Sequence, residues 1–219
     1  MCDYVNKKEL LCPRKIFSEW ICNVQSEIRK EYGITFSYNP IGSGSRNMVI
    51  RRCDNGYFDL DFQIVIQSIP DDMNWNEDCK TFKDIFRNSF NKYKPQGFNY
   101  CKDRSQSLRT KNINLGFGFD IIITYFDSND NFYILYNKKD SNGANNEDYE
   151  WAKRKKMNKY HERLKLIKES KMWDYLRKIY KNKRHEHIND QRTKKHSYQL
   201  LNEAVVETLL TFRIKKYPK

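Results

Sequence analysis

Two aspartates, separated by one residue, lie within an apolar segment of the chain. The segment YFDLDFQIVIQ, residues 57–67, is otherwise aromatic and β-branched, which predicts a largely buried β-strand. Side chains alternate between the two faces of a strand, so Asp59 and Asp61 point to one side and Leu60 to the other. Two carboxylates about 6–7 Å apart on one face repel each other unless a cation lies between them. The chain must therefore fold so that this strand face meets a positive partner.

A third acid lies in a second apolar segment. Asp120 belongs to FGFDIIITYF, residues 117–126, which also reads as a strand. If the two strands are neighbours, Asp120 joins Asp59 and Asp61 in one cluster. Mg²⁺ prefers hard oxygen ligands, and two such ions can activate a hydroxyl and neutralise a leaving phosphate. Two alternatives stay open here: a solvated strand edge for the pair, or an ordinary strand-start residue at position 120.

A glycine-serine turn precedes the acidic strand. Gly42, Ser43, Gly44 and Ser45 follow one another directly after the segment ITFSYNPI, which reads as a strand. Small residues let backbone N–H groups and a serine hydroxyl approach phosphate oxygens closely. The pattern predicts a phosphate-binding turn, with a plain loop as the alternative.

The rest of the N-terminal region mixes helices and strands. Residues 13–32 carry apolar side chains at spacings of three and four, which predicts a helix. A second helix is predicted over residues 76–93, and three or four strands over residues 98–137. The segment NMVIRR, residues 47–52, reads as a short strand or a helical turn, and CDNG, residues 53–56, as a tight turn.

A change of pattern divides the chain. Residues 138–150, KKDSNGANNEDYE, are polar and hold Gly143 among Ser and Asn, which is typical of a linker. From Tyr149 to Leu210 the segment has no proline or glycine and its pattern is helical. We therefore expect an α+β fold, with a mixed β-sheet core and flanking helices over residues 1–140 and a helical C-terminal lobe over residues 149–219.

Net charge indicates the class of partner. The chain has 41 Lys and Arg residues against 28 Asp and Glu residues, a formal net charge of +13. This charge favours binding of nucleotides, RNA or other polyanions, and the alternative is that it serves solubility alone. Basic residues concentrate in residues 153–171 and 177–195. Tyr160, Tyr175 and Tyr180 interleave with them, a pattern that suits base stacking, whereas a solvated helix face is the alternative.

Cysteine spacing and hydropathy indicate the compartment. The six cysteines are widely spaced and none forms a CxxC pair, so free thiols in a reducing cytoplasm are expected rather than a zinc site. The N-terminal residues lack the apolar core of a signal peptide, and no window is apolar enough for a membrane span. We expect a cytoplasmic protein without a membrane partner, and the sequence does not indicate its oligomeric state.

The segments GSGSRNMVIRRCDNGYFDLDF and FDIII together resemble the DNA polymerase β-like nucleotidyltransferase superfamily. The pattern of that superfamily is a Gly-Ser turn, two acids separated by an apolar residue on a strand, and a third acid on a neighbouring strand. The resemblance assigns phosphate binding to Gly42 and Ser43, with Gly44 and Ser45 as the alternative turn. It assigns metal binding and catalysis to Asp59, Asp61 and Asp120.

Two C-terminal segments narrow the resemblance. IKESKMWDYLRKIY and KKHSYQLLNEAVVETLL are similar to helices of 2′-5′-oligoadenylate synthetases and bacterial cyclic-oligonucleotide synthases, in which a lysine precedes a tryptophan by two residues. Here these residues are Lys171 and Trp173. The resemblance implies that Lys171 and Ser197 contact the triphosphate and that Tyr198 stacks near the base. Ordinary packing between helices is the alternative for Trp173 and Tyr198.

The resemblance also implies an activity. The chain would use two Mg²⁺ ions, with Mn²⁺ as a substitute, to move NMP from ATP or GTP to a hydroxyl and release pyrophosphate. Asp59 and Asp61 would hold both ions, and Asp120 would hold the catalytic ion and help to activate the hydroxyl. The acceptor would be a nucleotide, giving an oligonucleotide or cyclic nucleotide signal, or an RNA end. The alternatives are an RNA-tailing or AMP-transferring enzyme, or a non-catalytic nucleotide- or RNA-binding module on the same fold.

Overall fold

The computed structural model describes residues 3–52, 55–139, 145–154, 158–189, 195 and 197–216. The chain divides into two compact units. The larger unit comprises Val5–Val49 and Asn55–Lys155, and the smaller unit comprises Met1–Tyr4, Ile50–Asp54 and Lys156–Lys219.

A mixed β-sheet forms the centre of the larger unit. Its strands lie in the order β1 (Thr35–Ile41), β2 (Phe58–Ser68), β5 (Phe117–Phe126), β4 (Leu108–Asn112) and β3 (Lys102–Asp103). Strands β2 and β5 are parallel, whereas the other neighbours in this order are antiparallel. The sheet and its flanking helices confirm the predicted α+β fold.

Two further strands extend the sheet beyond the end of β4. Strand β6 (Phe132–Lys139) pairs with the last residues of β5, and β7 (Asn145–Arg154) pairs with β6. The linker predicted over residues 138–150 is therefore wrong over residues 138–139 and 145–150, and the helical pattern predicted from Tyr149 is wrong over residues 149–154. Residues 140–144 of that predicted linker lie outside the described residues.

The alternation of side chains explains strand β7. Asp148 and Glu150 both lie within 4 Å of the ammonium group of Lys138 on β6, at 3.4 and 2.9 Å. Trp151 points to the other face, where its indole N–H donates to the carbonyl of Trp75 at 2.6 Å. This period of two is the pattern of a strand with one polar and one aromatic face.

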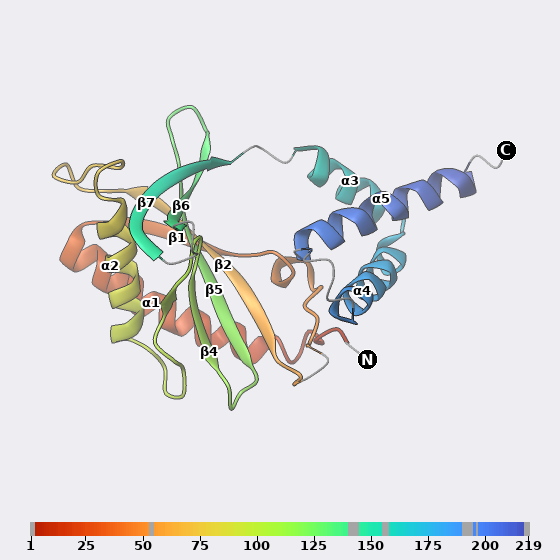
Figure 1. Cartoon of the computed structure of the whole chain (residues 1–219), viewed down its shortest axis with the longest axis horizontal. Helices are drawn as coiled ribbons and strands as arrows, with labels where there is room; N and C mark the ends of the chain where they lie inside the picture. Colours follow the sequence, from red (N-terminus) through yellow and green to blue (C-terminus); the bar gives the residue numbers. More distant parts are fainter. Residues whose placement is uncertain are drawn as a thin grey trace. The chain divides into compact units, whose positions relative to one another are not determined.

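Helices α1 (Leu11–Tyr32) and α2 (Cys79–Lys92) cover one face of the sheet (Figure 1). Both predicted helices are confirmed. Helix α1 ends at Gly33, whose φ of +65° lies in the left-handed region that glycine adopts without steric cost.

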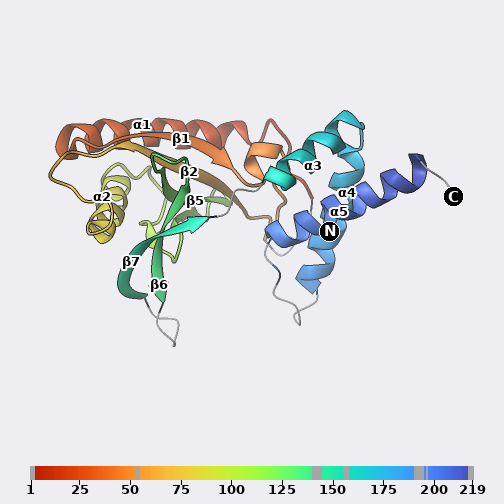
Figure 2. The same ribbon diagram turned by 90° about the horizontal axis from the view of Figure 1, so that it is seen from above.

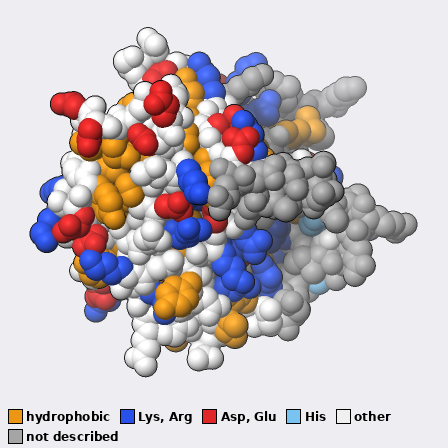
Figure 3. Space-filling model, turned by 60° about the vertical axis from the view of Figure 1, so that its left-hand side comes forward, with side chains coloured by type: hydrophobic (Ala, Val, Ile, Leu, Met, Phe, Trp, Pro, Cys, Tyr) orange, Lys and Arg blue, Asp and Glu red, His pale blue; other side chains and the backbone are white. Residues whose placement is uncertain are grey.

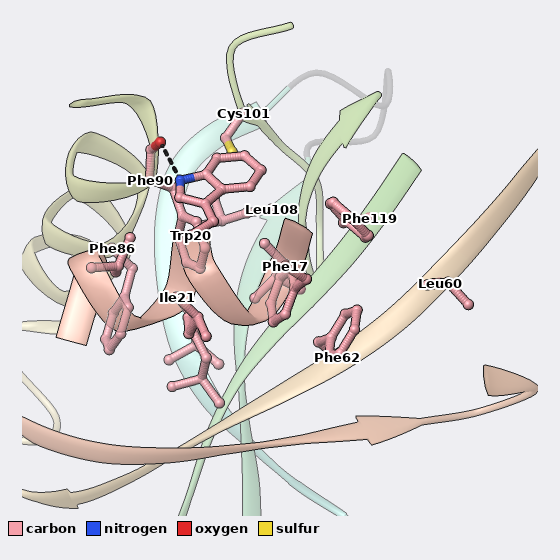
Figure 4. Packing of buried hydrophobic residues seen from close by; sticks show 14 of the residues in the cluster. Phe17, Trp20, Ile21, Leu60, Phe62, Phe86, Phe90, Cys101, Leu108 and Phe119 are labelled. Carbon is pink, nitrogen blue, oxygen red and sulfur yellow. Dashed lines mark hydrogen bonds between the residues drawn. The ribbon is translucent and has the colours of Figure 1, made fainter. Parts of the chain in front are cut away.

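Aromatic residues dominate the core beneath α1 (Figure 4). The ring of Phe17 stacks on Phe62 of β2 with centroids 3.6 Å apart, and the Trp20 indole donates to the carbonyl of Phe90 at 3.1 Å. The core-facing residues of β2 are Phe58, Leu60, Phe62, Ile64 and Ile66. Because they alternate with the acids, Asp59 and Asp61 face away from the core.

The segment between β1 and β2 is irregular. Residues Gly44–Arg46 form a single 3₁₀ turn, η1, and Asn47 follows it with a φ of +53°. The strand or helical turn predicted over residues 47–52 is therefore wrong, because only Ile50 makes a strand-like bridge there, to Tyr4. Residues Cys53 and Asp54 of the predicted CDNG turn lie outside the described residues.

Three helices make up most of the smaller unit: α3 (Asn158–Glu169), α4 (Trp173–Asn189) and α5 (Ser197–Lys216) (Figure 2). Leu and Ile side chains from all three helices are buried. The N-terminal segment also belongs to this unit, because the Tyr4 hydroxyl donates to the carbonyl of Arg177 at 2.8 Å. None of the helices that the structure describes is long and apolar enough to cross a membrane.

Candidate active site

The structure brings the three predicted acids together on the open face of the sheet. Asp61 lies directly beside Asp120 in the parallel register of β2 and β5, and Asp59 lies beside Gly118. The side chains of Asp59 and Asp120 are 19% and 22% exposed, so solvent and a ligand can reach them. The adjacency of the two acidic strands, which the sequence could only assume, is thus observed.

Arg109 on β4 ties two of these acids together. Its Nη2 atom lies 2.8 Å from Asp59 Oδ2 and 3.2 Å from Asp120 Oδ2. In the antiparallel register, Arg109 pairs with Asp120. The sequence analysis missed this residue. The alternation of Arg109 with buried Leu108 and Thr110 indicates that its side chain lies on the face away from the core. That this face also carries the acids follows only from the strand order.

The acids retain an excess of negative charge. Burial raises the pKa of Asp61 to about 7, and the charges of Asp120 and Asp59 add to the effect, whereas Arg109 opposes it. Burial also raises the pKa of Asp120, again against the influence of Arg109. One guanidinium therefore does not offset the burial and mutual repulsion of these carboxylates.

The Tyr57 hydroxyl lies beside Gly118 on β5, on the same side of the sheet as Asp59. Burial raises the pKa of Tyr57, and so does the nearby negative charge of Asp59. Gly118 leaves the room for this hydroxyl, because a Cβ atom there would overlap the Tyr57 hydroxyl and lie 3.1 Å from Asp59 Oδ1. The sequence analysis missed Tyr57 and Gly118, since their contact depends on the β2–β5 register.

The glycine-serine turn lies against Asp61. Gly42 has a φ of +60°, and a Cβ atom on it would lie 2.5 Å from Asp61 Oδ2. The Ser45 hydroxyl donates to the Gly42 carbonyl at 3.0 Å, so Ser45 braces the turn. No hydrogen bond of the Ser43 hydroxyl is found in the part of the chain that the structure describes. Ser43 is thus the better placed of the two serines to bind a phosphate oxygen.

The donor set fits a divalent cation. Among the described residues, no three His, Cys, Asp or Glu side chains are arranged to hold a metal ion as they stand. Carboxylate oxygens are nevertheless the ligands that Mg²⁺ prefers, and Asp61 and Asp120 lie directly beside each other on β2 and β5. Asp59, Asp61 and Asp120 therefore match the chemistry of a magnesium site, and the Arg109 guanidinium contacts two of them.

The other predicted nucleotide-binding residues belong to the smaller unit. Lys171, between α3 and α4, is exposed and has a φ of +56°. Ser197, at the start of α5, accepts a hydrogen bond from Arg184 Nη1 at 2.6 Å. Tyr198 is 46% exposed, and its ring lies 5.4 Å from that of Tyr160. Their predicted roles stay predictions.

The basic helices give mixed support to polyanion binding. Tyr160 and Tyr180 are buried, so only Tyr175 of the three interleaved tyrosines has a ring exposed enough for base stacking. Lys183 and Lys195 pair with glutamates of α5 at 2.8 and 2.7 Å. On the face that Figure 3 shows, which is mainly that of the larger unit, Lys and Arg side chains also lie beside Asp and Glu side chains. Residues 155–157 and 190–194 of the basic stretches lie outside the described residues.

Several solved structures of bacterial nucleotide synthases share this fold. The STING-associated CdnE c-di-GMP synthase from Capnocytophaga granulosa superposes with a TM-score of 0.61 at 14% identity, covering 93% of this chain and 60% of that one. GTP-bound DncV from Vibrio cholerae superposes with a TM-score of 0.57 at 12% identity. The match covers 93% of this chain and 52% of the DncV chain. V. cholerae DncV cyclic AMP-GMP synthase in complex with the linear intermediate 5′ pppA(3′,5′)pG superposes with a TM-score of 0.56 at 11% identity. The match covers 93% of this chain and 54% of that one.

These matches establish the fold. The chain shares its fold with the DncV and CdnE synthases, as the sequence resemblance led us to expect. It spans about half the length of the DncV chains, 52% in the GTP-bound form. No family model and no curated protein sequence matches the chain.

Proposed function

We propose that the chain is a metal-dependent nucleotidyltransferase, which moves NMP from an NTP to a hydroxyl and releases pyrophosphate. The observation that carries the proposal is the cluster of Asp59, Asp61 and Asp120 on two parallel strands, with the turn at Gly42 against one of them. The shared fold supports it, since DncV structures hold GTP and a linear dinucleotide intermediate.

The residues of the larger unit have distinct roles in this proposal. Ser43 donates its hydroxyl to a phosphate oxygen, and Gly42 lets the backbone approach the triphosphate. Asp59, Asp61 and Asp120 would hold two Mg²⁺ ions, or Mn²⁺, whose charge neutralises the phosphates and acidifies the attacking hydroxyl. Asp120 would hold the catalytic ion and help to activate that hydroxyl.

We further propose an oligonucleotide or cyclic nucleotide as the product, with ATP or GTP as the substrate. This part rests on the fold shared with CdnE and DncV and on the resemblance of the helical unit. Lys171 and Ser197 would bind the triphosphate, and Tyr198 would stack on the base. Transfer of NMP to an RNA end, or transfer of AMP to another acceptor, would use the same chemistry. These reactions differ only in their product.

The first experiment identifies the product. The purified chain is incubated with each labelled NTP and with Mg²⁺ or Mn²⁺, and the products are separated and identified by mass spectrometry. A linear or cyclic oligonucleotide supports the proposal. Label on added RNA, or on the protein itself, would replace the proposed acceptor with one of the alternatives.

A second candidate is a non-catalytic nucleotide-binding module. The contact of Arg109 with Asp59 and Asp120 favours it, because an arginine lies where a shared cation would bind. Calorimetry separates the two functions. Nucleotide binding that is equal with and without Mg²⁺, together with no turnover, would indicate the module, whereas Mg²⁺-dependent binding with pyrophosphate release indicates the enzyme.

A further inference from the structure

One nitrogen of Arg109 contacts two carboxylates from different strands. Nη2 lies 2.8 Å from Asp59 Oδ2 on β2 and 3.2 Å from Asp120 Oδ2 on β5. The contact with Asp59 is a charge-assisted hydrogen bond, and the contact with Asp120 is a longer ion pair. The nitrogen therefore lies between the two carboxylates, where a cation that both of them ligate would also lie.

The position of Arg109 is fixed by the sheet. Arg109 pairs with Asp120 across β4 and β5, while Asp120 pairs with Asp61 across β5 and β2. The three side chains thus come from adjacent positions on three neighbouring strands and share the open face. The Arg109 side chain is 28% exposed, so it has a route to solvent when its partners are taken.

We infer that Arg109 is a resident counter-cation of the acid cluster, which a divalent ion displaces from Asp59 and Asp120 when it binds. The inference rests on the proposed function, because it takes these acids as the metal ligands. Arg109 holds the carboxylates of β2 and β5 together before the metal arrives and thereby limits their repulsion. A singly charged ion has no electrostatic advantage over the tethered guanidinium, whereas a divalent ion has one.

This role makes a prediction that a purely structural role does not. An arginine that only supports the fold would weaken metal binding when it is removed. Removal of a competing counter-cation strengthens metal binding. The metal then meets no repulsion from the guanidinium and does not have to break the two contacts of Arg109. Arg109 is thus a positioning residue whose loss raises metal affinity while the metal-free protein loses stability.

The test compares Arg109→Gln with Lys102→Gln. Lys102 lies opposite Arg109 in the β3–β4 pair and is exposed, so its removal deletes the same charge without the two contacts. Mn²⁺ binding to the metal-free full chain is measured by electron paramagnetic resonance without nucleotide. We expect Arg109→Gln to bind Mn²⁺ about tenfold more tightly than the wild type and Lys102→Gln to stay within about twofold.

The outcomes separate this inference from the proposed function. If the wild type binds Mn²⁺ and Arg109→Gln binds it equally or more weakly, the inference fails and the proposed function stands. If neither protein binds Mn²⁺ at millimolar concentration, the metal site itself is absent and both fail.

A measurement on the wild type covers the case in which Arg109→Gln does not fold. The ¹⁵N signal of the Arg109 guanidinium is identified by its loss in Arg109→Lys and followed as Mg²⁺ is added. Displacement shifts the signal and increases its hydrogen exchange rate at the Mg²⁺ concentration that half-saturates the site. A guanidinium signal that saturating Mg²⁺ leaves unchanged would overturn the inference.

Discussion

Gly42 and Asp61 are in direct contact: a Cβ atom on Gly42 would lie 2.5 Å from Asp61 Oδ2. Gly42 also has a φ of +60°, which other residues adopt at a cost. We expect Gly42→Ala to lower the free energy of unfolding by about 1–3 kcal/mol and activity by at least about tenfold, since it displaces an acid of the proposed metal site.

Gly116→Ala provides the matched control for that variant. Gly116 has a φ of +73°, but a Cβ atom there meets nothing within 4 Å. It therefore carries the backbone strain without the collision. Urea unfolding and pyrophosphate release of both variants separate the two effects. Equal losses of activity in the two variants would show that the contact with Asp61 has no special role.

Tyr57 and Gly118 are expected to act as a pair. Gly118→Ala collides with the Tyr57 hydroxyl and also meets the Thr110 carbonyl oxygen at 2.5 Å, so a loss of about 2–4 kcal/mol in unfolding free energy is expected. In the double variant, Tyr57→Phe removes one of these collisions and recovers about 1 kcal/mol of the loss. A double-mutant cycle by urea unfolding measures this coupling, and strictly additive losses would contradict the contact.

The carboxyl group of Asp61 is expected to destabilise the metal-free protein. Its pKa rises from 3.8 to about 7 on folding. The folded chain thus binds more protons than the unfolded chain between these values, so stability falls as the pH rises from about 4 to 7. Asp61→Asn removes this loss. Its free energy of unfolding at pH 8 is therefore expected to be about 1–3 kcal/mol higher than that of the wild type.

Urea unfolding in the presence of a chelator tests this difference. The stability gain of Asp61→Asn is expected at pH 8 and is expected to shrink as the pH falls toward 4. A variant that is no more stable than the wild type at pH 8 would show that burial of Asp61 is less costly than its surroundings indicate.

Lys171 combines a predicted role with an unfavourable backbone conformation. Its φ of +56° costs a non-glycine residue about 1 kcal/mol. Lys171→Gly is therefore expected to raise the free energy of unfolding by about 0.5–1 kcal/mol, whereas Lys171→Ala leaves it nearly unchanged. If Lys171 binds the triphosphate, both variants bind NTP more weakly by a similar factor. Calorimetry that shows wild-type affinity in both would remove Lys171 from the site.

The sequence carried the local part of the site. Alternation within residues 57–67 placed Asp59 and Asp61 on one face, and the apolar segment around Asp120 marked a second strand. The helix over residues 13–32 followed from its period of three and four. Each of these features depends on a short window, which is why a single sequence sufficed.

Features that depend on the order of the strands in the sheet could not be predicted from the sequence. Arg109 reaches the acids only because β4 lies beside β5, and Tyr57 meets Gly118 only because β2 lies beside β5. Strand β7 was read as a linker because its polar face outweighed the alternation of Tyr149 and Trp151. Polar composition indicated exposure correctly there and secondary structure wrongly.

The most direct test of the account is Mg²⁺-dependent pyrophosphate release from ATP and GTP. The wild type is compared with Asp59→Ala/Asp61→Ala and with Asp71→Ala/Asp72→Ala, which removes two exposed acids from the loop after β2. We expect release by the wild type and by the loop variant, and a fall of at least about a thousandfold when the acids of β2 are removed. Equal release by all three proteins, or release that does not require a divalent ion, would contradict the central claim that these acids bind the catalytic metal.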